Sequence, residues 1–476
     1  MSNSVFGAAA QSSRSPVSFN MCAFIFVALA ARGALAQSGQ PAGVQTLEQR
    51  VADMQIRYEG RIAALEAQVL HLRAAPTALP VADDAIEQAL GGVMLSGVMG
   101  RLDQTTRFSN RFNPAISLVS DLVYSYSSRA DSFETDNQFR MRPIELGFAG
   151  RIDPHVNLIA ALAADEDGMT LEEGYAVWDK GLPDTFTLRA GRLPIDFGKL
   201  SAMHDHELSF VDKPSTLQEY LGGKALTTGL AVHHWFGVGE VPVRWSVGVG
   251  NSLGQDAHAI QGPAAGEQHH GAAATGAEPF GRRGADDFVW TARVTSSIDL
   301  GANDDLQLGS SGIFVPGAKE FFYTDPPANT AVASGALGRS IIGIDAHWRH
   351  ADAGSTGAFT LGGEWIWVRM ELADTSAPVP VFSGARNHSQ GGWLFAEYAF
   401  DEHWSVGARA ERFQHAEDSS LVWRGWNCAL TWNIDEFNRV RFELGGVDTD
   451  DAVAPYGFAM LQWTLVLGSH AHALAW

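Results

Sequence analysis

The stretch that decides the fold is YGFAMLQWTLVL, residues Tyr456–Leu467, close to the C-terminus. Apolar and polar side chains alternate along it, the pattern of a β-strand with one apolar face. Segments of about ten residues repeat this alternation through most of the chain. Such strands suit two places, the core of a soluble protein or the wall of a barrel with lipid outside and water inside. The rest of the sequence decides between them.

Residues 1–36 have the organisation of a secretory signal peptide. A polar start with one cation, Arg14, precedes the apolar run Phe19–Ala31, and Ala34-Leu35-Ala36 supplies the small residues of a cleavage site. The apolar run is too short to span a bilayer. We therefore expect cleavage after Ala36, followed by a linker over residues 37–43.

Charge and cysteine content exclude several classes of protein. Cleavage removes two arginines and no acid, so the net charge moves from −21 to −23, which excludes a nucleic-acid binder. The mature chain keeps one cysteine, Cys428, so no internal disulfide forms. No later apolar run reaches the length of a membrane-spanning helix. If the chain lies in a membrane, it does so as a closed β-barrel, which satisfies its backbone in lipid.

Residues 44–73 predict a coiled-coil helix that stands apart from the strands. Apolar side chains follow heptad spacing with one stutter: Val44, Leu47, Val51, Met54, Tyr58, Ile62, Leu65, Val69 and Leu72. The alternative is an amphipathic helix packed on its own domain. A linker over residues 74–115 separates this segment from the strands.

The connections between strands favour the membrane. Short connections are expected at Lys180–Pro183, Gly237–Glu240, Asp401–Glu402 and Asn433–Glu436. Aromatic side chains stand beside them, as in an interfacial girdle: Trp178, Trp235, Phe236, Phe400, Trp404, Trp432 and Phe437. The intervening connections are long and polar, over residues 193–224, 251–285, 315–338 and 371–390. Short turns at one end and long loops at the other are typical of β-barrels in the outer membrane of a Gram-negative bacterium.

The fold expected is therefore all-β, a transmembrane antiparallel barrel of sixteen strands within residues 116–476, with eighteen strands as the alternative. The strands are expected near 116–126, 140–152, 156–163, 169–179, 184–192, 225–236, 241–250, 286–297, 305–314, 339–350, 357–369, 391–400, 404–413, 421–432, 437–446 and 456–467. An even number places the first strand's start on the short-turn side and pairs the last strand with the first.

Several short motifs resemble those of the phosphate-selective porin O/P family. They are Asn113–Leu118, Glu172-Glu173-Gly174-Tyr175-Ala176, Leu188–Arg192 and Phe197-Gly198. The resemblance covers most of residues 44–476 and implies a trimeric sixteen-stranded porin with a periplasmic N-terminal segment. His204-Asp205-His206, Phe210–Pro214 and the tail Leu467–His472 are similar to a zinc-associated subgroup. Trp476 resembles the terminal aromatic signal read by barrel-assembly machinery.

The charge of the pore departs from that family, whose channels select anions with lysine and arginine ladders. This chain has five lysines. The alternation points a mixed set of side chains into the lumen: Asp121, Glu145, Arg151, Arg189, Arg244, Arg293, Asp345, His347, Glu364, Glu397, Arg409, Glu411, Arg439, Arg441 and Glu443. Seven arginines face seven carboxylates, and the overall acidity favours cations. Phosphate as a substrate is therefore doubtful.

The connection 193–224 is the candidate constriction, since the resemblance implies that a long loop at this point enters the lumen. Seven of its side chains are candidates: Asp196, Lys199, His204, Asp205, His206, Glu207 and Asp212. His204 and His206 point the same way in an extended segment, and imidazole with nearby carboxylate suits zinc or a similar metal. A purely structural loop is the alternative. The Gly/Ala-rich connection 251–285 is expected to be solvated and flexible.

Catalytic patterns are absent, including Gly-x-Ser-x-Gly and His-Glu-x-x-His, so no enzyme, catalytic residue or bound cofactor is expected. The expected function is passive diffusion of small hydrophilic solutes or ions through a trimer in lipid, with a cation bias and divalent metal such as zinc as possible cargo. An anion-selective porin of the family type is one alternative. The other is a structural or adhesive outer-membrane barrel.

Overall fold

The computed structural model describes residues 115–129, 137–166, 168–183, 185–251, 253, 257–261, 284–301, 303–319, 321–323, 331–333, 335–351, 357–374, 381–450 and 454–468. The expected signal peptide, linkers and coiled coil lie outside these residues, except for Ala115, the last residue of the expected linker 74–115, which begins the first strand. The terminal aromatic Trp476 also lies outside them. Within the described part, no helix is both long enough and apolar enough to cross a membrane.

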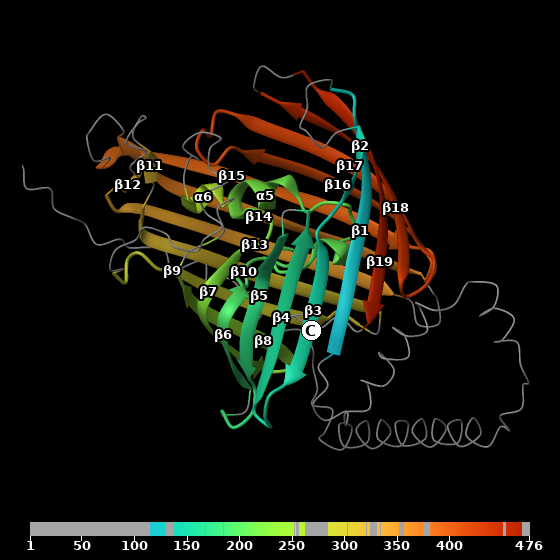
Figure 1. Ribbon diagram of the computed structural model, residues 1–476, viewed down its shortest axis with the longest axis horizontal. Helices are drawn as coiled ribbons and strands as arrows, with labels where there is room; N and C mark the ends of the chain where they lie inside the picture. The colour runs from blue at the N-terminus through green and yellow to red at the C-terminus, as the bar shows by residue number, and fades with distance from the viewer. Residues whose placement is uncertain are drawn as a thin grey trace, which may run out of the picture. The chain divides into compact units, whose positions relative to one another are not determined.

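The described chain forms a closed antiparallel barrel of sixteen strands, as the sequence predicts (Figure 1). The strands of the main sheet are β1 (Ala115–Ser127), β2 (Gln138–Met141), β3 (Ile144–Arg151), β4 (Val156–Asp165), β5 (Gly168–Trp178), β6 (Phe186–Pro194), β7 (Leu226–Val238), β8 (Val241–Gly250), β9 (Val289–Asp299), β10 (Asp304–Ala318), β13 (Leu337–Ala351), β14 (Ala358–Asp374), β15 (Val381–Ala399), β16 (Trp404–Gln414), β17 (Val422–Asn433), β18 (Asn438–Thr449) and β19 (Tyr456–Gly468). Because β2 and β3 pair end to end with β1, they count as one barrel strand. A small separate ribbon joins β11 (Phe321–Tyr323) to β12 (Ala331–Ala333).

The barrel closes between its first and last strands. β1 pairs antiparallel with β19 from Ser117 opposite Gly468 to Ser127 opposite Phe458. In Figure 1 these two strands, cyan and red, lie side by side. The expected closure of the alternating stretch Tyr456–Leu467 against the segment near 116–126 is thus confirmed. The start of β1 lies at the short-turn end, because Ala115 pairs with Ala149 beside the β3–β4 turn.

The second barrel strand is interrupted at Arg142-Pro143, where the sequence predicted one continuous strand over residues 140–152. Proline has no N–H to donate to the ladder. The Arg142 N–H donates to Asp121 O at 2.9 Å, and regular pairing resumes at Ile144. The break lets the Arg142 side chain enter the barrel, where it is largely buried beside Asp121.

The two faces of the barrel wall differ as the alternation predicts. Large apolar side chains are exposed on the outer face, and polar and charged ones are buried on the inner face. The expected girdle residues Trp178, Trp404 and Trp432 point outward and are exposed, and the rings of Trp404 and Trp432 stack at 5.6 Å. Trp235 is an exception. It shares the face of buried His233 and lies 5.8 Å from the Arg244 guanidinium, so it faces the lumen instead of lipid.

Two hairpins extend further than expected at the long-loop end. β14 continues to Asp374 and β15 begins at Val381, so most of the predicted connection 371–390 is strand. β10 likewise continues to Ala318. The apolar alternation ends before these strands do, because a hairpin that rises beyond the bilayer no longer needs an outward apolar face.

A hydrophobic core lies inside the barrel at the long-loop end. It joins helix α5 (Ser215–Leu221) and short helix α6 (His258–Gln261) to inward apolar residues of β10, β13 and β14. In Figure 1 these two green helices lie over the strands β13–β15. The expectation that the whole connection 251–285 is solvated was wrong for its described part, since Leu253, Ala257, Ala259 and Ile260 are buried in this core. Small and apolar residues in a Gly/Ala-rich stretch fit between a helix and a wall.

Candidate functional site

The connection between β6 and β7, residues 195–225 (the inner loop), is built on adjacent strand ends. Pro194 pairs with Leu226, and the Ile195 N–H donates to Ala225 O at 2.8 Å. Both ends of the loop therefore leave the wall at one point. Besides α5 the loop contains one 3-10 turn, Asp205–Glu207.

Asp196 fastens the first residues of the inner loop to the wall. Its carboxylate accepts hydrogen bonds from Arg244 and from the Ser246 hydroxyl at 2.7 Å, and Arg293 Nε lies 3.4 Å away. Burial favours the neutral acid, but Arg244 and Arg293 outweigh burial and hold the pKa of Asp196 below its usual value. Asp196 is therefore an anionic anchor of the loop.

The next residues pass close to a buried carboxylate of β14. Gly198 has φ +57°, and a Cβ there would lie 2.2 Å from Glu364 Oε2, so glycine is required at this position. The Gly198 N–H donates to Ser311 Oγ at 3.0 Å. Neither carboxylate oxygen of Glu364 has a hydrogen-bond partner among the described residues. Burial lowers the pKa of the adjacent Lys199.

Arg293 is the centre of the charge network behind the loop. It is 2% exposed and donates to Asp345 at 2.6 and 3.0 Å and to Ser311 Oγ at 2.6 Å. Since Arg293 also faces Asp196, one guanidinium serves two carboxylates that come from the loop and from β13.

The middle of the inner loop is held by its backbone against the opposite wall. Arg441 donates to Phe210 O at 2.8 Å and to Leu208 O at 2.5 Å. The Val211 N–H donates to Glu443 Oε2 at 2.8 Å, and Arg409 donates to Asp212 O at 2.8 Å. These three wall side chains project from β16 and β18. The loop therefore crosses the interior from β8–β10 to β16–β18.

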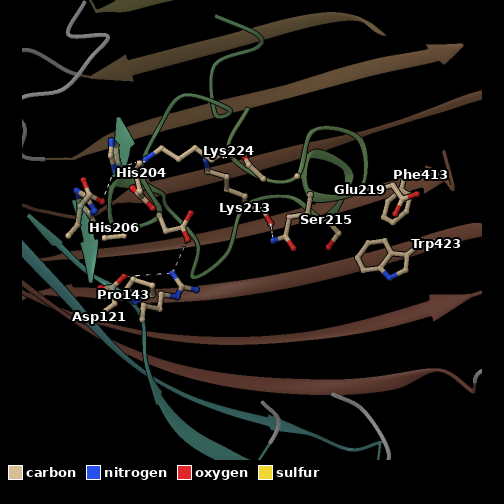
Figure 2. Close-up of a pocket in the computed structure, with 18 of the residues that line it drawn as sticks. Asp121, Pro143, His204, His206, Lys213, Ser215, Glu219, Lys224, Phe413 and Trp423 are labelled. Carbon is tan, nitrogen blue, oxygen red and sulfur yellow. Dashed lines mark hydrogen bonds and ion pairs between the residues drawn. The ribbon is translucent and has the colours of Figure 1, made fainter. Parts of the chain in front are cut away.

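Between the inner loop and the wall is a cavity of about 800 Å³. Figure 2 shows Asp121, His204 and His206 at one side of it, Phe413 and Trp423 at the other, and Lys213 and Lys224 between them. Its lining carries charges of both signs: Asp121, Arg129, Arg142, Glu145, Glu172, Asp205, Lys213, Glu219 and Lys224. A cavity so lined is polar and suits hydrated solutes.

His204 sits in an ion-pair cluster at the side of the cavity. Its Nδ1 lies 2.7 Å from Glu145 Oε2, and its Nε2 lies 3.4 Å from Glu173 Oε1. Lys224 Nζ lies 3.3 Å from His204 Nδ1 and 3.2 Å from Glu173 Oε1. Burial would lower the pKa of His204, but the hydrogen bonds to Glu145 and Glu173 outweigh it and raise the pKa to about 9. The cluster ties the loop to β3 and β5.

The arrangement bears on the metal expected at His204 and His206. Ligand atoms of Glu145, His204 and His206 lie within 4.8 Å of one another, and two imidazoles with one carboxylate are ligand types that zinc accepts. A cation there would have to displace the His204 proton and tolerate the Lys224 ammonium 3.3 Å from Nδ1. At neutral pH these residues fit an ion-pair cluster better than a metal centre.

The cluster predicts a pH dependence. The pKa of His204 rises from 6.5 to about 9 when the loop is in place, so its stabilising contribution is complete below pH 6.5 and is lost as pH rises through about 9. We expect loop-dependent current noise to increase between pH 8 and pH 10 in single-channel records. His204→Gln should remove this increase.

Lys213 provides the internal control for the pH experiment. Its ammonium donates to Ser201 O at 3.0 Å, and burial lowers its pKa from 10.5 to about 8. The effect of Lys213 on stability has the opposite sign to that of His204. As pH rises above 8, Lys213 loses its buried charge, and the cost of burying that charge is relieved. A noise increase of equal size in His204→Gln would assign the effect to a group other than His204.

The structure places the other predicted residues as follows. Asp205 and Asp212 both face Arg142, at 3.6 Å for Asp205, and Glu207 accepts from the His204 N–H at 2.7 Å. The His206 carbonyl accepts a hydrogen bond from Arg439.

On the wall, the side chains expected to face the lumen lie on the inner face. Thirteen of the fifteen are buried or contact the inner loop: Asp121, Glu145, Arg244, Arg293, Asp345, His347, Glu364, Glu397, Arg409, Glu411, Arg439, Arg441 and Glu443. Among these, Glu411 lies 3.2 Å from Arg409. The Arg189 guanidinium lies 6.0 Å from the Tyr175 ring.

Sequence reasoning missed four charged residues of the site: Arg142, Glu173, Lys213 and Lys224. Arg142 belongs to the strand break, and Glu173 follows a register shift in β5, so simple alternation did not place either of them. The Glu172-Glu173 pair in the motif Glu172–Ala176 could have identified Glu173 as a residue of the site. Lys213 and Lys224 are two of only five lysines, which could have marked them.

No family model matches the chain. An uncharacterized protein of Aquifex aeolicus (strain VF5) is 24% identical over 423 residues, covering 77% of this chain and 81% of that protein. Among solved structures, OprB of Pseudomonas putida is 12% identical with a TM-score of 0.49, covering 78% of this chain and 97% of that chain. The anion-selective porin from Comamonas acidovorans is 9% identical with a TM-score of 0.45, covering 75% of this chain and 100% of that chain.

The barrel's own architecture gives its location. It has an even number of antiparallel strands, exposed apolar side chains on the outer face and aromatic residues beside the short turns. Only a closed barrel of this kind, or helices, satisfies every backbone group in lipid. The protein is a porin-like barrel of the Gram-negative outer membrane.

Proposed function

We propose that the protein is an outer-membrane porin for passive diffusion of small hydrophilic solutes, with the inner loop as its constriction. One observation carries the proposal. The loop crosses the barrel interior on charged anchors and leaves a polar cavity of about 800 Å³ beside it. A structural barrel needs neither a polar interior cavity nor a loop held across it by ion pairs.

Swelling of proteoliposomes tests this proposal. Vesicles containing the purified protein should swell in isotonic monosaccharide, more slowly in disaccharide, and hardly at all in a polymer too large for the constriction. Empty vesicles are the control. A barrel that supports no swelling with any of these solutes would instead favour the structural or adhesive alternative.

We propose a modest preference for cations. Charges of both signs line the cavity, and several carboxylates stand at turns of the barrel, including Asp153, Asp401, Asp418 and Asp435. Backbone N–H groups lower the pKa of Asp153 and Asp401, and the Asn438 side-chain amide, with the Phe437 N–H, lowers the pKa of Asp435, so these carboxylates stay ionised at neutral pH. Negative charge at the mouths raises the local concentration of cations.

The cation preference is measured from the reversal potential in a potassium chloride gradient. We expect its sign to report a potassium permeability above that of chloride, and the preference to weaken as salt rises, since screening shortens the reach of the surface charge. An anion-selective potential would support the phosphate-porin alternative instead.

The resemblance to the phosphate-selective porin O/P family, with trimeric assembly and a periplasmic coiled coil at residues 44–73, is part of the proposal. Phosphate itself is disfavoured because two of the three lysines of the inner loop, Lys213 and Lys224, are engaged by protein groups. Lys213 donates to two backbone carbonyls, and Lys224 pairs with Glu172 at 2.9 Å and with Glu173 at 3.2 Å. Such paired cations do not form a ladder for an anion.

A second candidate, passage or transient binding of divalent metal, is favoured by the grouping of Glu145, His204 and His206. Added zinc should then reduce the single-channel current, and His204→Ala with His206→Ala should abolish the response. An equal current with and without zinc in the unmodified protein would leave the ion-pair cluster as the role of these residues.

A further inference from the structure

A stack of aromatic rings forms one end of the polar cavity. Phe413 on β16 lies directly opposite Trp423 on β17, and their rings stack at 5.1 Å with an angle of 18° between their planes. Phe413 is buried, and the ring of Tyr220 on α5 meets it edge to face at 6.2 Å. Figure 2 shows Phe413 and Trp423 together at the end of the cavity away from His204. The inner loop therefore supports the stack, and partly buried Trp423 remains open to the cavity.

A second aromatic residue lines the same cavity from the last strand. Tyr456 on β19 lies on the inward face, an even number of residues before buried Gln462. Only β18 separates it from Trp423, with Thr449 opposite Trp423 and Val447 opposite Tyr456. Neighbouring strands are about 4.8 Å apart, so β17 and β19 are about 10 Å apart. That separation leaves space for one ring-shaped solute between the two aromatic side chains.

We call Trp423, Thr449 and Tyr456 the aromatic slot, since all three line the cavity. The position of the Trp423 ring is fixed from two directions. Phe413 stacks on it from β16, and a Cβ at Gly425 would lie only 2.2 Å from its Cη2 atom, so the indole extends over this glycine. Rigid aromatic side chains provide a large contact area and lose little conformational entropy when a ligand binds.

The polar groups near the aromatic slot carry charges of both signs. Glu219 of α5 lines the cavity, accepts the Ala416 N–H at 2.9 Å and lies 3.4 Å from His415 Nδ1. Arg129 also lines the cavity, with its guanidinium 5.9 Å from the centre of the Tyr456 ring. These opposed charges give a charged solute no consistent attraction. A neutral solute that both donates and accepts hydrogen bonds finds partners of both kinds.

We propose that the aromatic slot binds the ring of a neutral sugar in its pyranose form. This inference rests on the proposed porin function and names its solute class. The C–H groups on one face of a pyranose carry partial positive charge and pack on the negative face of an aromatic ring. The hydroxyl groups at the edge of the sugar then reach the polar lining. A quaternary ammonium ion would also be attracted by aromatic rings, but Arg129 already places a cation over Tyr456.

The test compares glucose with sorbitol, which has the same carbon chain but no ring. The ion current through the purified protein in planar bilayers is recorded while each solute is added. Glucose should reduce the current in a saturable manner, because a bound sugar ring obstructs the cavity. Sorbitol should produce only the small, non-saturating decrease that follows the conductivity of the bulk solution. Trp423→Leu should raise the half-saturating glucose concentration about five- to tenfold, since it removes the aromatic face.

Three further variants make the result specific. Trp426→Leu is the matched control, because Trp426 lies on the same strand but faces outward and is 57% exposed. It should leave the half-saturating concentration within twofold of the unmodified protein. Trp423→Tyr keeps an aromatic face and should retain most of the affinity. Tyr456→Leu should weaken the block from the other side of the slot, so it tests the proposal even if Trp423→Leu does not assemble.

Four results would each overturn the aromatic slot as a sugar site. They are equal effects of glucose and sorbitol, a glucose effect that does not saturate, equal effects of Trp423→Leu and Trp426→Leu, and a saturable block by choline but not by glucose. In all four the barrel still conducts ions, so the porin function stands. A folded barrel that carries no current overturns the porin function itself, and this inference with it.

Discussion

Replacing residues 197–223 by a four-residue glycine-serine linker is expected to raise the single-channel conductance several-fold. The linker can span the gap, since Ile195 and Ala225 are joined by a 2.8 Å hydrogen bond. The deletion removes α5 and the crossing segment, which fill the interior between opposite walls. A barrel of sixteen strands without an inner plug encloses a wide aqueous channel. Conductance in planar bilayers is the measurement.

A milder variant tests the same prediction if the deletion variant does not fold. Arg441→Gln removes the guanidinium that donates to Leu208 O and Phe210 O, but it leaves the loop and its apolar core in place. We expect larger current fluctuations with a smaller rise in mean conductance. If the deletion and Arg441→Gln both conduct like the unmodified protein, the inner loop does not limit the current.

Arg293→Met is expected to lower the free energy of unfolding by about 3–5 kcal/mol, the usual cost of removing one member of a buried ion pair. The substitution leaves Asp196 and Asp345 without their shared guanidinium, beside Glu364, which already lacks a hydrogen-bond partner among the described residues. The expected loss of stability is large because the carboxylates of Asp196 and Asp345 are buried and cannot be solvated by water. Denaturant unfolding in lipid vesicles, followed by tryptophan fluorescence, measures it.

Two comparisons make the Arg293 result specific. Arg424→Met breaks a pair with Asp450 whose side chains are 42% and 41% exposed, so we expect a much smaller loss of stability than for Arg293→Met. Adding Asp345→Asn to Arg293→Met should restore part of the stability, because it removes one unpaired charge. Equal losses for Arg293→Met and Arg424→Met would show that the buried network does not stabilise the barrel.

The strands were predictable because the bilayer imposes one rule on all of them. Every membrane-spanning strand must present apolar side chains to lipid, so the alternation near Tyr456–Leu467 recurs around the barrel. The short turns and the aromatic residues beside them identified the short-turn end of the barrel. Closure of β1 on β19 then followed from an even number of strands.

Where lipid does not impose the rule, prediction was weaker. The polar segment 381–390 is strand in the structure but lies above the apolar band, so its sequence resembles a loop. Trp235 was assigned to the girdle by its position beside a turn, although its register shares the face of His233 and points it at Arg244. The residue type predicted the height of Trp235 in the barrel wall correctly, but it assigned the side chain to the lipid-facing side instead of the lumen-facing side.

The contacts of the inner loop could not be derived from the sequence. Val211 meets Glu443, and Phe210 meets Arg441, across more than half of the barrel chain. No local spacing encodes such pairs, because they depend on how far the loop reaches across a closed barrel. Alternation named Glu443 and Arg441 as inward residues, but their partners became visible only in the folded chain.

Single-channel recording of the unmodified protein in planar bilayers tests the central claim most directly. Stepwise, ohmic conductance in 1 M potassium chloride is predicted, with steps in groups of three if the barrel assembles as proposed. The inner loop should keep each step well below that of the 197–223 deletion. A folded, membrane-inserted protein that produces no conductance steps would contradict the account.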